Sequence, residues 1–169
     1  MTRALVGLGL LLLLGCSPLQ PSSASSPPPG LQSSTFEQLL SRQASLLAAP
    51  AKTFVKLSLD AEERHYLVPA RYQGERRVVA DRHWDVIQIW GRATRQPLEL
   101  TLPYKEEIAV ASDHNRYRVA LRPELADDMA QNLQPGNAIR LSLLLVGAIR
   151  SADETTMEPV FLLTGYWRD

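Results

Sequence analysis

The hydrophobic pattern of the chain changes from a helical period to an alternating one at about Thr53. Before that point the apolar side chains fall on one face of a helix, at Phe36, Leu39, Leu40, Leu46 and Leu47. Ser34 and Glu37 have the spacing of a capping box, and Pro50 closes the segment. The pattern therefore predicts one amphipathic helix at the start of the folded part.

After this helix, runs of alternating or continuous apolar residues predict β-strands. The runs cover residues 53–59, 66–72, 84–91, 98–104, 117–121, 139–149 and 160–167. Val86–Trp90 and Leu141–Val146 are apolar on nearly both faces, which is typical of central strands packed between two layers. Turns are expected at Gln73-Gly74-Glu75 and at Asp113-His114-Asn115, because such residues favour tight backbone conformations.

A second short helix is predicted from Pro123 to Leu133, because Pro123 suits a first helical turn and Pro135-Gly136 ends the segment. The order of elements indicates a mainly β domain of the α+β class with two peripheral helices, built as a small antiparallel β-barrel or sandwich. A helix just before the last two strands is similar to the OB-fold, in which a helix separates the third and fourth of five strands. An OB-like barrel is therefore one of the expected forms.

The N-terminal segment has the pattern of an export signal. Arg3 precedes an apolar run from Ala4 to Leu14, which as a helix would be about 17 Å long and too short to span a bilayer. The run ends in Leu13-Leu14-Gly15-Cys16, which resembles the signal peptide and lipobox of bacterial lipoproteins, with Leu14 where a small residue is commoner. This resemblance implies that residues 1–15 are a signal peptide and that Cys16 is the lipidation site.

The same resemblance implies a location. Acyl chains such as palmitate on Cys16 would anchor the mature protein to a membrane of the cell envelope without a membrane span. Ser17, rather than Asp, follows the cysteine, and in a Gram-negative host this implies the outer membrane, facing the periplasm. The membrane is therefore one expected partner.

Residues 16–34 form the expected tether between this anchor and the folded part. Between Ser17 and Ser34 the chain holds five prolines and seven serines, and its only sizeable apolar residues are Leu19 and Leu31. Such a segment buries too little apolar surface to offset its ordering entropy, so we expect it to be disordered. The remaining residues, 35–169, fit one globular domain.

Composition and motifs limit the partners, cofactors and reactions expected of this protein. The chain balances 18 Lys and Arg with 18 Asp and Glu, so net charge gives no reason to expect nucleic acid as a partner. The single cysteine is consumed by the expected acylation, and His65, His83 and His114 lack metal-ligand spacing, so surface histidines, no metal and no cofactor are expected. The chain carries no recognisable catalytic motif, which favours a non-enzymatic role.

One basic and aromatic region remains as a candidate binding site. Its members between Glu62 and Arg95 are Arg64, His65, Arg71, Arg76, Arg77, Arg82, His83, Arg92 and Arg95, with Tyr66, Tyr72, Trp84 and Trp90 among them. Arginine forks suit anions and aromatic faces stack on rings, so Arg76, Arg77 and Trp90 are the candidate ligand-binding residues. The alternative is an ordinary charged surface in which nearby acids pair with the arginines, namely Glu62, Glu63, Glu75, Asp81 and Asp85.

Three functional hypotheses follow from these patterns. The leading one is a membrane-anchored lipoprotein that acts without catalysis, as an accessory or assembly factor that binds another envelope protein. A second is a lipoprotein that binds a glycan or an anionic ligand through the region Arg64–Arg95. The third is an envelope hydrolase whose site has no recognisable motif.

Overall fold

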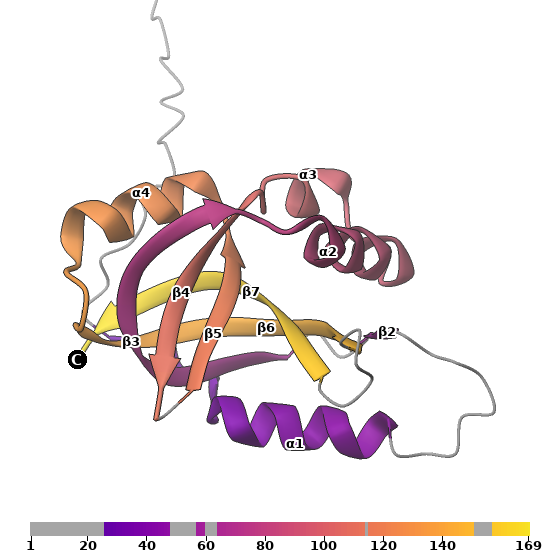
Figure 1. Cartoon of the computed structure of the whole chain (residues 1–169), viewed down its shortest axis with the longest axis horizontal. Coiled ribbons are helices and arrows are strands. Elements are labelled where there is room, and N and C mark those ends of the chain that lie inside the picture. Colours follow the sequence, from indigo (N-terminus) through magenta and orange to yellow (C-terminus); the bar gives the residue numbers. More distant parts are fainter. Residues whose placement is uncertain (1–25, 48–56, 60–63, 114, 151–156) are drawn as a thin grey trace, which may run out of the picture.

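The computed structural model describes residues 26–47, 57–59, 64–113, 115–150 and 157–169 (Figure 1). The predicted signal peptide, the predicted lipidation site Cys16 and the first part of the predicted tether lie outside the described residues, as does most of the loop before the last strand.

Five strands form a closed ring. They are β3 (His65–Val78), β4 (Glu106–Ser112), β5 (Asn115–Leu121), β6 (Ala138–Arg150) and β7 (Met157–Arg168). The ring runs β3-β4-β5-β7-β6, and β6 pairs back to β3 over seven residue pairs from His65↔Leu144 to Arg71↔Ala138. Neighbours are antiparallel except β5 and β7, which pair in parallel at Ala120↔Leu162. The prediction of a mainly β, barrel-like α+β domain is therefore confirmed.

The order of the ring strands is that of an OB-like barrel. Helix α4 (Pro123–Asn132) lies between β5 and β6, the third and fourth ring strands along the chain. The helix matches the prediction closely, with Pro123 in its first turn, Met129 and Leu133 buried, and Gly136 following at a φ of 93°. The final strand β7 extends through the aromatic C-terminus to Arg168.

Two short strands extend the ring. Strand β1 (Gln32–Ser33) pairs in parallel with β3, and β2 (Leu57–Leu59) pairs antiparallel with β6. The end of the segment predicted to be a disordered tether therefore joins the sheet. Its polar composition did not indicate this, because strand pairing uses backbone groups and needs no apolar side chain.

Helices cover the two ends of the barrel, as Figure 1 shows: α1 (Phe36–Leu47) lies at one end and α4 at the other. At the first end, the Phe36 ring stacks on Tyr117 with centroids 4.1 Å apart and meets Phe161 edge-on at 5.3 Å. The capping box of α1 is one residue later than predicted. Gln38 N donates to Thr35 Oγ1 (3.2 Å), and Thr35 N donates to the Gln38 side chain (3.1 Å).

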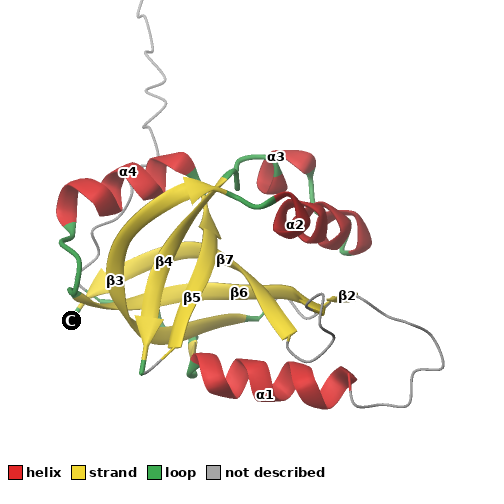
Figure 2. Cartoon of the chain, in the orientation of Figure 1, coloured by secondary structure: helices red, strands yellow, loops and turns green. Residues whose placement is uncertain are grey.

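The connection from β3 to β4 differs from the prediction. Residues 84–91, predicted as a strand, belong to helix α2 (Asp81–Ala93), and residues 98–104, also predicted as a strand, contain the single-turn helix α3 (Leu98–Thr101) (Figure 2). The described residues thus hold four helices instead of two. The strand that pairs between β3 and β5 is β4, which the sequence analysis did not predict.

The apolar side chains form two cores. One fills the barrel, where β3, β4, β5, β6 and β7 contribute alternate residues together with α1 and α4. The other lies between α2 and the outer side of the wall, where Val86, Ile87 and Trp90 pack against a set from three strands, Ala120, Leu144, Val146, Val160 and Leu162. Helix α2 covers only part of the outer wall. We call the part that α2 leaves uncovered, which includes Arg116 and Arg118 of β5, the open half.

Candidate functional site

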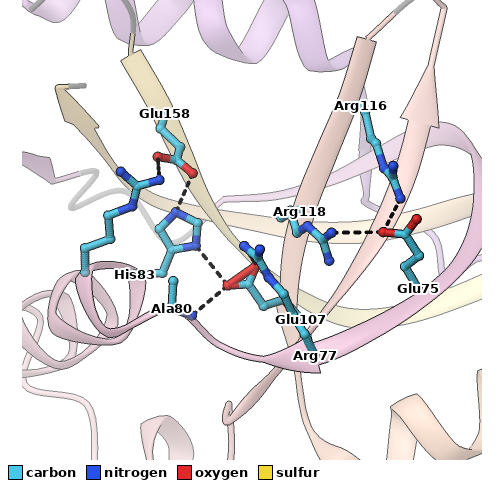
Figure 3. A network of polar contacts seen from close by, with 9 residues as sticks. Glu75, Arg77, Ala80, His83, Glu107, Arg116, Arg118 and Glu158 are labelled. Atoms are coloured by element: carbon cyan, nitrogen blue, oxygen red, sulfur yellow. Dashed lines mark hydrogen bonds and ion pairs between the residues drawn. The ribbon is translucent and has the colours of Figure 1, made fainter. Parts of the chain in front are cut away.

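A chain of charged contacts runs over the outer side of the barrel and around the edge of α2 (Figure 3). Its buried centre is Glu107 of β4, whose residue exposure is 0%. Glu107 Oε1 accepts a hydrogen bond from Ala80 N at the start of α2 (2.8 Å) and one from His83 Nδ1 (3.2 Å). Its other oxygen accepts from Arg77 Nη2 (3.1 Å). Glu107 therefore connects β4 to β3 and to α2.

His83 extends this chain to the last strand. Its Nε2 lies 2.9 Å from Glu158 Oε1 of β7, at ion-pair distance but without hydrogen-bond geometry. Glu158 Oε2 is also paired with Arg82 Nη2 at 2.6 Å. Both nitrogens of the His83 ring face carboxylate oxygens, and the Nδ1 contact with Glu107 is the one with hydrogen-bond geometry. The ring thus links α2 to β4 and β7.

The contacts of Glu107 set its ionisation. Burial alone would raise the pKa of this carboxyl. The hydrogen bonds from His83, Ala80 N and Arg77, with the charge of His83, outweigh burial and lower the pKa of Glu107 to about 2. Glu107 is therefore an anion throughout the pH range in which the protein would function.

A second carboxylate, Glu75, lies on the open half of the same wall (Figure 3). One of its oxygens, Oε2, accepts from Arg116 Nη2 and from Arg118 Nη2, the latter at 3.0 Å, and both arginines belong to β5. The hydrogen bond from Arg116 is the main reason that the pKa of Glu75 is below its ordinary value. The Glu75 side chain is 53% exposed, so water screens these charges.

A bulge in β3 places Glu75 there. Between Tyr72 and Arg76 strand β3 advances four residues while its partner β4 advances two, from Val110 to Ile108. Gly74 has a φ of 75°, which a side chain would strain. The predicted turn at Gln73-Gly74-Glu75 is therefore a bulge inside one strand, and bulges of this kind redirect side chains.

The three predicted ligand-binding residues do not form one site. Arg76 is paired with Glu106 and, at 2.6 Å, with Asp127 of α4. Arg77 is paired with the buried Glu107. Trp90 is 4% exposed and packs in the core beneath α2, so its ring is not available for stacking on a ligand.

The charged surface predicted as the alternative describes this region better, although the partners differ from those expected. The acids that hold Arg76, Arg77 and Arg82 come from distant parts of the chain, Glu106, Glu107, Asp127 and Glu158. These acids were not predicted as partners of the arginines, because pairing between strands cannot be predicted from the local spacing of residues.

The histidines differ in burial and surroundings. His83, predicted at the surface, is 4% exposed, since it lies on the inner side of a helix that was read as a strand. His65 is exposed, with Nδ1 at 3.3 Å from Thr164 Oγ1. His114 lies outside the described residues. Asp113, beside it, has a φ of 50°, and Ser112 pairs with Asn115, which fits the predicted turn.

The residues that sequence reasoning missed are Glu107 and Glu158 around His83, and Arg116 and Arg118 around Glu75. A weak signal existed for Arg118, since it alternates with Tyr117 and Val119 in the predicted strand 117–121 and so must lie on its outer side, whereas Arg116 lies just before that predicted strand. For the described ranges, no cluster of three or more His, Cys, Asp and Glu side chains could hold a metal ion.

Comparisons with known proteins do not extend this picture. No family model matches the chain, and neither a curated protein nor a solved structure matches it. Within the part of the chain that the structure describes, no helix is long and apolar enough to cross a bilayer. The fold and the charged sites therefore have to be interpreted from their own geometry.

Proposed function

We propose that this protein is a lipid-anchored lipoprotein of the cell envelope that acts without catalysis, as an accessory factor that binds another envelope protein. The lipobox Leu13-Leu14-Gly15-Cys16 supports the anchor. The architecture supports binding on the outside of the barrel, because apolar side chains fill the interior and helices lie at both ends. The lack of a recognisable catalytic motif in the sequence supports a non-catalytic role.

The observation that carries the proposal is a group of exposed apolar side chains around α3. Leu98, Leu100 and Leu102 are 56%, 45% and 44% exposed, and Val78 at the end of β3 is 77% exposed. Val79 N donates to Lys105 O (3.0 Å), so the end of β3 and the segment after α3 lie at the same end of the barrel. Exposed large apolar side chains are common at protein-binding surfaces, and three of these four lie within residues 98–102. We call these four side chains the α3 surface.

A protein fits the α3 surface better than a lipid bilayer does. The surroundings of the leucines are of mixed charge: the exposed Glu99 lies between Leu98 and Leu100, and Arg92, Arg95 and Lys105 flank α3 along the chain. A carboxylate in this position would be repelled by anionic lipids, whereas a protein partner can offer it a donor.

The test is site-specific photo-crosslinking in the native host. A photoreactive residue at Leu100 is expected to crosslink one defined membrane protein, and the same residue at the exposed Gln131 of α4 is expected not to. Adding Leu98→Glu should abolish the product, because a buried carboxylate without a partner opposes association. The same product from both positions, or a product that survives Leu98→Glu, would contradict the proposed surface.

The anchor has its own test. Cys16→Ala removes the proposed acylation site and is expected to move the protein from the membrane fraction to the soluble envelope fraction. Metabolic labelling with an alkyne fatty acid should mark the parent protein and leave the variant unmarked. If the variant stays in the membrane and the parent takes up no label, the lipoprotein assignment is wrong.

A further inference from the structure

The ion pair of Glu75 is much more exposed than that of Glu107, the other carboxylate of the wall. A single carboxylate oxygen accepts from both Arg116 and Arg118, and the side chains of Glu75 and Arg116 are 53% and 49% exposed. Arg118 is less exposed, at 24% of its side chain. Arg118 Nη1 is buried and has no hydrogen-bond partner among the described residues. The two arginines therefore offer more donor capacity than Glu75 uses.

The surroundings of this pair are basic. Strand β4 contributes small residues beside the arginines, with Ala109 opposite Arg118 and Ala111 opposite Arg116. The outward-facing charges on this part of β3, β4 and β5 are Arg71, Arg77, Arg116 and Arg118 against Glu75 and Glu107. Glu107 is fully buried and committed to His83 and Ala80. The exposed part of the face therefore carries an excess of positive charge, and its accessible carboxylate is Glu75.

We propose that Arg116 and Arg118 form a binding site for a carboxylate side chain of an acidic segment of the partner protein, and that Glu75 occupies this site in the free protein. This inference rests on the proposed function, since it assigns a chemistry to the partner. Binding exchanges one carboxylate for another at the two guanidinium groups. The incoming carboxylate takes over the guanidinium contacts that Glu75 makes in the free protein.

The chemistry of the site favours a carboxylate. The contact that the protein itself makes here is with a carboxylate, and arginine donors form their strongest hydrogen bonds with charged oxygens. The exchange needs only a rotation of the half-exposed Glu75 side chain, which leaves the backbone pairing of β3 unchanged.

The experiment measures binding of a fluorescein-labelled oligoglutamate peptide to the purified folded protein by fluorescence anisotropy at low salt. Glu75→Gln removes the internal competitor and is expected to tighten binding by up to about fivefold. Glu124→Gln, which removes one exposed negative charge from α4, is the matched control and should change binding much less. Equal tightening by both variants would show a bulk charge effect and overturn the proposal.

The reverse variants remove the site. Arg116→Gln with Arg118→Gln is expected to weaken binding by at least about tenfold, because two charge-assisted hydrogen bonds are lost. Arg92→Gln with Arg95→Gln removes two exposed arginines elsewhere and is the matched control. Arg116→Gln alone, at a half-exposed position, keeps the test valid if the double variant fails to fold. Equal losses in test and control variants would contradict the site.

Competition separates the ligand classes. Unlabelled oligoglutamate should displace the labelled peptide. Inorganic phosphate that supplies the same molar concentration of negative charge should not. Equal displacement by phosphate would overturn the assignment to an acidic segment. Because the assay uses purified protein and peptide, its failure is distinct from failure of the crosslinking at the α3 surface, which tests whether a partner protein exists.

Discussion

Two carboxylates on the outer wall of the barrel, Glu107 and Glu75, are both held by arginines, yet they differ in burial. Glu107 is fully buried beside α2 and accepts hydrogen bonds from a backbone amide, an imidazole and a guanidinium group. Glu75 is half-exposed and shares one oxygen between two arginines. The same pairing chemistry thus gives a fixed structural link where water is excluded and an exchangeable contact where water reaches it.

Substituting each carboxylate with alanine should give the largest difference in stability between the two regions. Glu107→Ala leaves His83 and Arg77 without their partner and is expected to lower the free energy of unfolding by about 3–5 kcal/mol, the usual cost of breaking a buried pair. Glu75→Ala should leave the urea midpoint unchanged, because water replaces its contacts. Urea denaturation of both variants checks this, and similar losses would refute the distinction.

Acid should act on the buried region. The pKa of Glu107 is lowered from its ordinary value of 4.5 to about 2 in the folded protein, so its contribution to stability is present above pH 4.5 and is lost as the pH falls toward 2. Stability measured against pH should therefore fall more steeply in this window for the parent protein than for Glu107→Gln. Parallel curves would mean that Glu107 does not carry the acid response.

Substitution of His83 and of His65 should give a smaller difference in stability. His83→Gln breaks the link between α2 and the two strands and is expected to cost about 1–3 kcal/mol, because the buried Glu107 loses a hydrogen bond and Glu158 loses an ion-pair contact. His65→Gln, at an exposed position, should stay within about 0.5 kcal/mol of the parent. Thermal and urea melts check both, and an equal cost would argue against a structural role for His83.

The backbone that carries Glu75 should show the smallest measurable effect. Gly74→Ala places a side chain at positive φ and brings its Cβ to 2.8 Å from Pro135 Cγ, so we expect a loss of more than about 1 kcal/mol. Gly136→Ala is the control, since it also has positive φ but no heavy atom within 4 Å of its Cβ. Gly136→Ala should cost less. If the two costs are equal, the contact with Pro135 does not fix the bulge.

The sequence predicted most of the barrel because its strands show their period locally. Four ring strands, β3, β5, β6 and β7, coincide with predicted runs, and the helix before β6 was predicted almost to the residue. β4 escaped notice because it begins with Glu106-Glu107 and contains two alanines, a composition that local patterns do not favour for a central strand.

The same reasoning misread α2 and α3. Val86-Ile87-Gln88-Ile89-Trp90 is rich in β-branched and aromatic residues, which favours a strand, but burial at positions 83, 86, 87 and 90 follows the helical period. In α3 the alternation of Leu98, Leu100 and Leu102 reflects no buried face, since all three are exposed. In α2, packing of this buried face overrode local propensity.

The charged sites were harder to predict from the sequence than the fold was. The arginines near Arg76 were predicted to meet acids from their own region, but their partners lie on other strands and on α4. The strand that supplies Glu107 was not predicted, and the contact between Glu75 and Arg116 depends on a bulge. Such pairs follow from register, which no local pattern in a single sequence specifies.

The most direct test of this contrast follows the carboxyl groups of Glu75 and Glu107 by carbon-13 NMR while oligoglutamate is added. The account predicts that the Glu75 resonance shifts in a saturable way as its oxygen leaves Arg116 and Arg118, and that the Glu107 resonance stays in place. A Glu75 resonance that does not move while the peptide binds, or one that moves together with Glu107, would contradict the account.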